Sequence, residues 1–113
     1  MGAQKTWAWI IGVILVLVGI WGFLSEPILG IFATNTWHNL VHLITGLVFI
    51  WAGAKNMAKP TNTWLGLIYV LVGILGFFGI LTFLAVAGGN DPDNWLHIGI
   101  GVISLLVGLT AKS

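Results

Sequence analysis

The sequence predicts an all-α fold, a four-helix bundle that spans a membrane, and three observations support this prediction. Of the 113 residues, 58% are hydrophobic and only 6% are charged, a composition far from that of a soluble domain. Four apolar segments each approach the ~17–25 residues that a helix needs to cross a bilayer. The stretch VLVGIWGF recurs as VLVGILGF, which predicts two tandem helical-hairpin repeats, at about 7–54 and 64–110.

The four expected helices cover residues 7–24, 37–54, 64–86 and 95–110. Helices are expected because, inside lipid, every backbone amide must be hydrogen-bonded within its own segment. Each segment begins with a tryptophan, and indole rings favour the headgroup region of a membrane. The chain is too short for a second domain of this kind, so residues 1–113 are expected to form one four-span transmembrane domain.

The distribution of charge predicts the orientation. All four lysines lie before the first segment, between the second and third, or after the fourth, and these places share one side of the membrane. The three acidic residues lie in the two connections on the other side. Because lysine-rich loops stay in the cytoplasm, we expect both termini on the cytoplasmic side of the membrane. The lysines are Lys5, Lys55, Lys59 and Lys112; the acidic residues are Glu26, Asp91 and Asp93.

Local chemistry predicts where three of the helices begin. Thr36 and Asn39 lie at the head of the second segment, where their side chains are expected to help start the helix. Asp91 followed by Pro92 resembles an N-cap residue with proline in the first turn. Pro60 is expected to interrupt any continuous helix before the third segment. The connection at 25–36 carries no pattern that predicts its conformation.

The repeat extends to the second member of each hairpin. The first match has an offset of 54 residues, with seven of eight residues identical, and NLVHLITG (39–46) aligns with NWLHIGIG (94–101) at an offset of 55. Each repeat holds two spans, so both units should sit in the membrane the same way up. They are then expected to be related by a pseudo-two-fold axis along the membrane normal.

The second and fourth segments each carry a stripe of polar and small residues on one helical face, because the members step i, i+3, i+7, i+10, i+14. We expect these stripes to face the bundle interior. Glycine stripes in the first and third segments should let the helices approach closely. The two polar stripes are Asn39, His42, Gly46, Phe49 and Gly53, and Asn94, His97, Gly101, Ser104 and Gly108.

Four stretches together, VLVGIWGF, NLVHLITG, VLVGILGF and GGNDPDNWLH, resemble a family of small bacterial integral-membrane proteins catalogued as domain of unknown function 4383. The resemblance extends from about residue 13 to residue 108. It implies a four-helix membrane protein of bacteria. It implies no activity, cofactor or site residue, because the family has no established activity.

The sequence favours a non-enzymatic role. There is no cysteine, which excludes disulfides and thiolate metal sites, and the net charge of +1 gives no basic surface for nucleic acid. The acidic residues lie in outer connections, and no serine belongs to a catalytic motif. We therefore expect an accessory or structural subunit, or a self-associating module. Its partners would be the lipid bilayer and other membrane subunits, or a second copy bound through the glycine-rich faces.

Two alternatives use the histidines as ligands, whereas the simplest reading makes them hydrogen-bonding groups between helices. In the first alternative, His42 and His97 face each other and bind a haem or chlorophyll-type tetrapyrrole from opposite sides. Asn39 and Asn94 would support the ligands, and the glycines would leave room for the macrocycle. The absence of arginine and of outer lysines disfavours haem, whose propionates need cations, but not a chlorophyll-type pigment. No other cofactor is expected.

The second alternative is a metal-dependent membrane enzyme with a site near the outer surface. Its ligands would be His38, His42 and His97, completed by Glu26 or Asp91. No HExxH or comparably tight ligand spacing occurs. A further hydroxyl, that of Tyr69, lies in the middle of the third segment and is expected to bond to a neighbouring helix.

Overall fold

The computed structural model describes residues 2–24, 35–81 and 92–111. In these ranges all regular structure is helical, as the sequence predicts, and each helix is long and apolar enough to cross a membrane. The protein is a multi-pass membrane protein. Its helices are α1 (Ala3–Leu24), α2 (Thr36–Ala54), α3 (Ala58–Phe77) and α4 (Pro92–Thr110).

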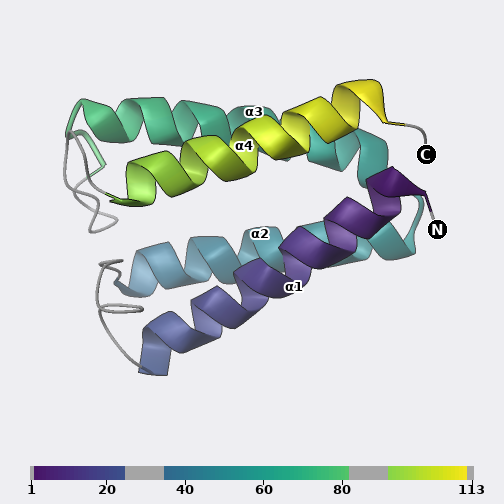
Figure 1. The fold of residues 1–113 in the computed structure, drawn as a ribbon. Coiled ribbons are helices and arrows are strands. Elements are labelled where there is room, and N and C mark those ends of the chain that lie inside the picture. The colour runs from purple at the N-terminus through teal and green to yellow at the C-terminus, as the bar shows by residue number, and fades with distance from the viewer. Residues whose placement is uncertain (1, 25–34, 82–91, 112–113) are drawn as a thin grey trace.

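The helices form two hairpins, α1–α2 and α3–α4, which lie side by side (Figure 1). Most contacts between helices fall within a hairpin, and the two hairpins meet through α1 with α3, α2 with α3 and α1 with α4. The start of α1, the turn between α2 and α3 and the end of α4 share one end of the molecule. We call it the lysine end, after Lys5, Lys55 and Lys59, and we call the opposite end the histidine end.

The turn between α2 and α3 is tighter than the sequence predicted. Asn56 has a φ of 60°, a left-handed conformation that asparagine tolerates better than most residues. The amide of Met57 donates to the carbonyl of Ala52 at 2.9 Å, the hydrogen bond of a Schellman helix ending. The chain therefore reverses within three residues and α3 begins at Ala58, so the expected start at residue 64 was wrong.

Pro60 does not separate the helices as expected, because it lies in the first turn of α3. Proline is tolerated there, since the first amides of a helix have no acceptor within it. At the other end, α3 ends at Phe77, and the expected end at residue 86 lies outside the described residues. The first helix also begins earlier than expected, at Ala3, and includes the polar residues before residue 7.

The second helix begins with a different cap from the one expected. The side-chain oxygen of Asn35 accepts a hydrogen bond from the amide of His38 at 2.9 Å, which makes Asn35 the N-cap and Thr36 the first helical residue. Asn39 is buried, and its side chain lies against Gly22 of α1. It does not cap the helix. Pro92 is the first residue of α4 as expected, whereas Asp91 lies outside the described residues.

Glycines bring the helices of each hairpin into backbone contact. A Cβ atom on Gly46 would lie 2.8 Å from the carbonyl oxygen of Gly12, and one on Gly101 would lie 2.7 Å from that of Gly66. Both distances are shorter than real Cβ contacts, so a larger residue would force the helices apart. The expected close approach at the glycine stripes is confirmed.

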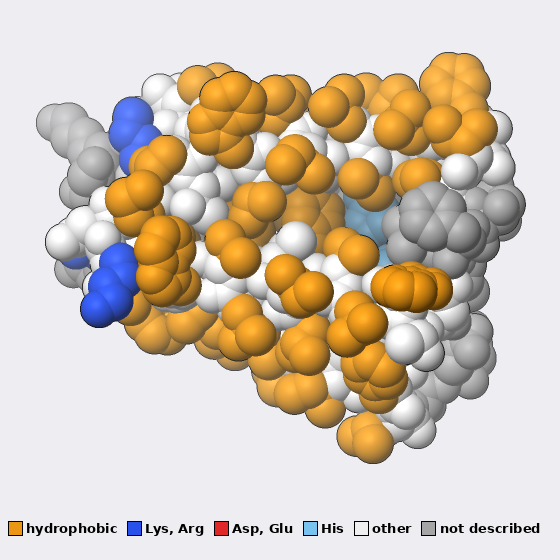
Figure 2. Space-filling model, turned by 180° about the vertical axis from the view of Figure 1, so that it is seen from behind, with side chains coloured by type: hydrophobic (Ala, Val, Ile, Leu, Met, Phe, Trp, Pro, Cys, Tyr) orange, Lys and Arg blue, Asp and Glu red, His pale blue; other side chains and the backbone are white. Residues whose placement is uncertain are grey.

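The interior of this bundle is more polar than its surface. Figure 2 shows a surface dominated by hydrophobic side chains, with lysines gathered at one end. Every member of the two polar stripes on α2 and α4 is buried, as the sequence predicted. Other buried polar residues come from all four helices. They are Gln4, His38, Asn62 and Asp93.

A buried hydrogen-bond network joins the hairpins at the lysine end. The amide nitrogen of Gln4 donates to the carbonyls of Val107 at 2.6 Å and Ala111 at 3.0 Å, and it lies 3.3 Å from that of Gly108. The Asn62 amide nitrogen donates to the Gln4 side-chain oxygen at 2.9 Å and backbone oxygen at 3.0 Å. Gln4 thus adds a donor to the carbonyls at the end of α4, where the Val107 carbonyl also accepts from the Ala111 amide at 3.0 Å.

Candidate metal centre at the histidine end

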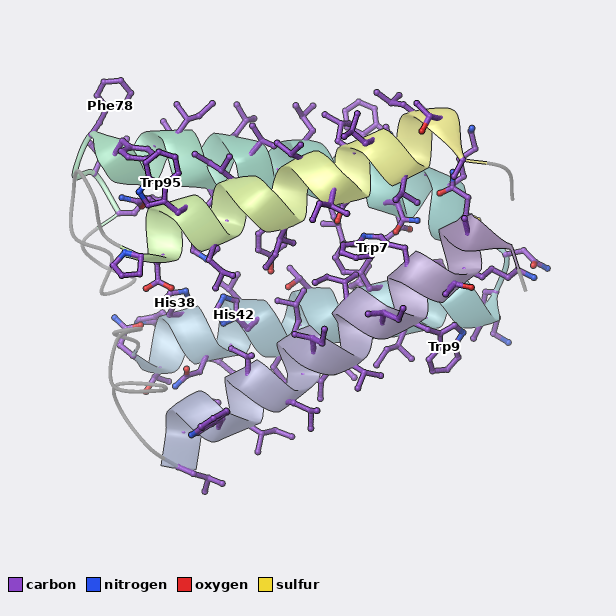
Figure 3. The ribbon with its side chains drawn as sticks, viewed as in Figure 1. Trp7, Trp9, His38, His42, Phe78 and Trp95 are labelled. Carbon is purple, nitrogen blue, oxygen red and sulfur yellow. The ribbon has the colours of Figure 1, made fainter. Side chains whose placement is uncertain are left out.

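Three histidines from two helices converge inside the bundle near the histidine end. His38 and His42 lie one turn apart on α2, and Figure 3 shows both pointing from α2 toward the other hairpin. His97 comes from α4, and the three side chains are only 2%, 4% and 3% exposed. The ring centroids are 4.4 Å apart for His38 and His42, 5.6 Å for His38 and His97, and 5.8 Å for His42 and His97. We call this group the histidine cluster.

The histidine cluster has the spacing of a nearly formed metal site. One ring nitrogen from each residue can be chosen so that all lie within 4.8 Å of one another. In a tetrahedral zinc site with Zn–N bonds of about 2.0–2.1 Å, ligand nitrogens lie about 3.3 Å apart. Closing that difference requires each nitrogen to move by roughly 1 Å toward a common centre, a shift that rotation of the imidazoles can supply.

A pocket of about 60 Å³ adjoins the cluster. The ring of Tyr69 lies 5.8 Å from that of His97, between centroids, and its hydroxyl is 2.7 Å from that of Thr45. The expected bond from Tyr69 to a neighbouring helix is confirmed. Thr45 in turn donates to the backbone carbonyl of Val41 at 2.8 Å. The remaining walls come from apolar residues of α2 and α3.

The electrostatics of the site suit a cation held by neutral imidazoles. The Nδ1 atom of His42 is buried and has no hydrogen-bond partner among the described residues, so it keeps a lone pair or a proton that water does not reach. Asp93 is buried four residues before His97 on the same face of α4. Its carboxylate is not one of the ligand atoms. It lies one helical turn from His97, close enough to offset the positive charge of a cation bound there.

The ligand set limits the metals that fit. Three imidazole nitrogens without sulfur suit zinc, copper, iron or nickel, whereas calcium and magnesium require oxygen ligands. Three protein ligands also leave a fourth coordination position open, which is the pattern of zinc sites that bind water or substrate. The arrangement can therefore hold a transition-metal ion and one further small ligand. Glu26 and Asp91, named above as a possible fourth ligand, lie outside the described residues.

The space for a tetrapyrrole is small. His42 and His97 are neighbours as expected, but the His38 ring lies within 5.6 Å of both, at the edge of the space between them. The glycines expected to make room, Gly46 and Gly101, face the backbones of α1 and α3. The pocket of about 60 Å³ is far below the ~300–1,000 Å³ of pockets that enclose drug-sized ligands.

The structure adds residues to the site that sequence reasoning did not connect with it. Tyr69 and Thr45 come from different helices, and nothing in their spacing links them to the histidines. Asn39 and Asn94 are buried on the same faces as His42 and His97, and the Asn39 side chain lies against Gly22 of α1. For His38, the i, i+4 spacing to His42 was the signal, because such residues share a helix face.

Comparison with known proteins gives a family but no activity. No curated protein and no solved structure matches the chain. One family model, described as a domain of unknown function, matches residues 5–110, which include all but the first two residues of the four helices and all three histidines of the cluster. The match agrees with the resemblance noted in the sequence. The chain belongs to the DUF4383 family of proteins.

Proposed function

We propose that this protein binds one transition-metal ion through His38, His42 and His97 in the membrane. The observation that carries the proposal is the convergence of three buried imidazoles with ring nitrogens within 4.8 Å of one another. Ionisable residues inside a membrane are costly and are retained mainly where they serve a function. Histidine is also the commonest metal ligand. Three of them in one apolar bundle are better explained by a shared ligand than by packing alone.

The proposed orientation has both termini in the cytoplasm of a bacterial cell, with the chain in the inner membrane. Lys5, Lys55 and Lys59 gather at one end of the molecule (Figure 2), and the buried Asp93 is in the first turn of α4 at the other end. This segregation supports the orientation through the positive-inside rule. The metal would then lie in the outer half of the bilayer.

The proposed architecture is a pair of tandem hairpin repeats. Its support is that the close glycine contacts in the two hairpins correspond at the offsets found in the sequence. Gly12 against Gly46 corresponds to Gly66 against Gly101, and Gly19 against the backbone of Asn39 corresponds to Gly73 against that of Asn94.

The repeats differ where the metal would bind. At an offset of 55, His38 corresponds to Asp93, while His42 corresponds to His97. One hairpin thus supplies two ligands, and the other supplies one ligand and an acidic group. This difference favours one asymmetric site per chain over two equivalent sites.

The proposed physiological role is a non-enzymatic accessory or structural subunit that carries this metal. Its support is that nearly all of each helix lies within an apolar span. Among the described residues, the stripe glycines already pack within the hairpins. Contacts with other subunits or a second copy would therefore use the apolar outer surface. A metal-dependent enzyme remains the competing proposal, and the open coordination position is the feature in its favour.

A tetrapyrrole carrier is the weaker competing proposal for the same histidines. Binding of a tetrapyrrole needs His42 and His97 to separate and the His38 ring to move away from the edge of the space between them. Such a rearrangement has a cost that a single metal ion avoids, because the ion needs only small imidazole rotations.

Metal analysis with an absorption spectrum tests the proposal. The protein is extracted in mild detergent, exposed to Zn²⁺ and freed of unbound metal. We expect one zinc per chain, with X-ray absorption showing imidazole nitrogen ligands. His42→Leu should lose the metal, and Gln4→Leu, a buried polar residue at the lysine end, should retain it. A metal-free native chain would overturn the proposal, and a Soret or chlorophyll band would favour the tetrapyrrole.

A further inference from the structure

The pocket beside the histidine cluster opens toward the outer surface between α2 and α3. Val41 of α2 and Ile68 and Val72 of α3 form its apolar walls, and the first two are 41% and 48% exposed. In Figure 2 a histidine is visible in a recess between hydrophobic side chains. Because the outer face of these helices contacts lipid, the opening leads from the hydrocarbon of the bilayer to the imidazoles.

The size and polarity of the pocket limit what it can admit. About 10–15 Å³ is enough for one water molecule, so a pocket of about 60 Å³ holds only a few atoms beyond the metal. The described residues that line it include no lysine, arginine or carboxylate. A small neutral molecule fits these walls, whereas an ion would have to cross apolar surface to reach the site.

The Tyr69 hydroxyl gives the pocket a hydrogen-bond acceptor. The Thr45 hydroxyl lies 2.8 Å from the carbonyl of Val41 and 2.7 Å from the Tyr69 hydroxyl, a contact in which either oxygen can donate. In both cases the phenolic oxygen of Tyr69 keeps at least one lone pair for a group in the pocket. A water molecule on the metal is a suitable donor to it.

We propose that the bound metal keeps its fourth coordination position in this pocket for an exchangeable, small, neutral ligand that enters from the bilayer. The inference rests on the proposed metal site. Water at this position would donate to Tyr69. A neutral diatomic molecule would replace that water by coordinating through its own lone pair, so no charge would be transferred and the metal would keep its oxidation state.

Carbon monoxide on copper(I) tests the inference directly. The full chain, reconstituted in lipid nanodiscs, is loaded with Cu⁺ without oxygen and exposed to CO, and the C–O stretch is recorded by infrared spectroscopy. We expect one band and one CO per bound copper. Copper content is measured on the same samples, so that failure to bind metal is distinguished from failure to bind CO.

Two valines on one face of α2 give a matched pair of variants. Val41 lines the pocket and is 41% exposed, while Val48, seven residues along, is 39% exposed and does not line it. Val41→Trp should fill the opening and weaken CO binding by about tenfold or more, since overpacking a filled space costs roughly 1–3 kcal/mol. Val48→Trp should leave CO binding unchanged. Both variants should keep one copper per chain, and Val72→Phe serves if Val41→Trp does not fold.

Each outcome decides the inference. A band that weakens only in the variants that fill the pocket supports it. Copper without a CO band overturns the inference and leaves the proposed metal site standing. A band of equal strength in both valine variants also overturns it, because the ligand would then bind elsewhere. A chain that takes up no copper refutes the metal site and, with it, this inference.

Discussion

The two ends of the bundle bury polar groups in opposite ways. At the lysine end, the side-chain oxygen and nitrogen of Gln4 both have protein partners, and Asn62 donates twice to Gln4. At the histidine end, three imidazoles face one another beside a pocket, and Nδ1 of His42 has no partner among the described residues. Both ends connect the hairpins and both adjoin a small pocket, but the pocket at the lysine end is lined by lysines and amides, whereas the one at the histidine end is lined by three imidazoles that can bind a metal.

The difference suggests that burial alone does not identify a functional site in a membrane bundle. Polar side chains between membrane helices commonly stabilise packing, at about 0.6 kcal/mol per hydrogen bond on average. The Gln4 network fits that role, although the side-chain oxygen of Asn62 has no hydrogen-bond partner in the described part of the chain. A cluster of good ligand atoms with adjoining volume indicates a ligand instead. The following substitutions are expected to separate the two roles.

The largest effect is expected from the histidine cluster. His42→Leu removes one of three ligands, and the affinity for Zn²⁺ should fall by at least about 100-fold, since losing even an outer-sphere partner costs ~10–100-fold. Without metal, the stability should change little, because leucine fills the space of a buried ring and removes a polar atom that lacks a partner. Zinc titration and thermal unfolding measure the two effects. Unchanged affinity would remove His42 from the site.

The next largest effect is expected at the lysine end, where a substitution should lower the stability and leave zinc binding unchanged. Gln4→Leu leaves the last carbonyls of α4 without their side-chain donor, and the free energy of unfolding should fall by about 1–3 kcal/mol. Zinc affinity should stay the same. The exposed neighbour Thr6 provides the control, because Thr6→Ala should alter neither quantity. A loss of zinc binding in Gln4→Leu would mean that the two ends are coupled.

A smaller effect is expected from the contact between Trp7 and Ser104. The indole nitrogen of Trp7 donates to the Ser104 hydroxyl at 2.8 Å, which joins α1 to α4. Trp7→Phe keeps an aromatic ring and loses that bond, so it should cost roughly 1 kcal/mol, including the smaller ring. Thermal unfolding of Trp7→Phe, compared with that of the exposed control Trp64→Phe, measures this loss of stability. Equal losses in both variants would show that the hydrogen bond contributes nothing.

The smallest effect on the fold is expected from Tyr69→Phe. This change removes the bond to Thr45 and should lower the stability by only ~0.6 kcal/mol. It should keep one zinc per chain, because all three imidazoles remain. Its zinc affinity, measured as for His42→Leu, should fall by no more than the ~10–100-fold that loss of an outer-sphere partner costs. A large loss of zinc would make Tyr69 a ligand.

The sequence predicted much of the fold because the fold depends on simple periodicity. Long apolar runs predicted the four spans, and the stepping of His42 with Gly46 predicted an inward face. The early start of α3 was missed because the left-handed Asn56 is a conformational choice that no hydrophobic pattern encodes. The N-cap was missed because Asn35, Thr36 and Asn39 all have suitable side chains.

The site was predicted only in part. The three histidines were found as candidates because His38 and His42 share a helix face and His97 aligns with His42 through the repeat. Their convergence depends on how the two hairpins place α2 and α4 relative to each other, a long-range property that spacing does not give. Tyr69 and Thr45 were not connected with the site for the same reason. The glycines were expected to leave room for a macrocycle, but they contact the neighbouring helix of their own hairpin. In a membrane, small residues let helices pack closely instead of leaving a cavity.

The measurement that tests the central claim most directly is the shift in unfolding temperature on adding Zn²⁺, compared among the native chain, His42→Leu and Gln4→Leu. A ligand that binds only the folded state stabilises it, by about 2.7 kcal/mol at 100 times its dissociation constant. We expect equal upward shifts for the native chain and Gln4→Leu, and none for His42→Leu. No shift in the native chain, or an equal shift in His42→Leu, would contradict the assignment of the histidine end as a metal site.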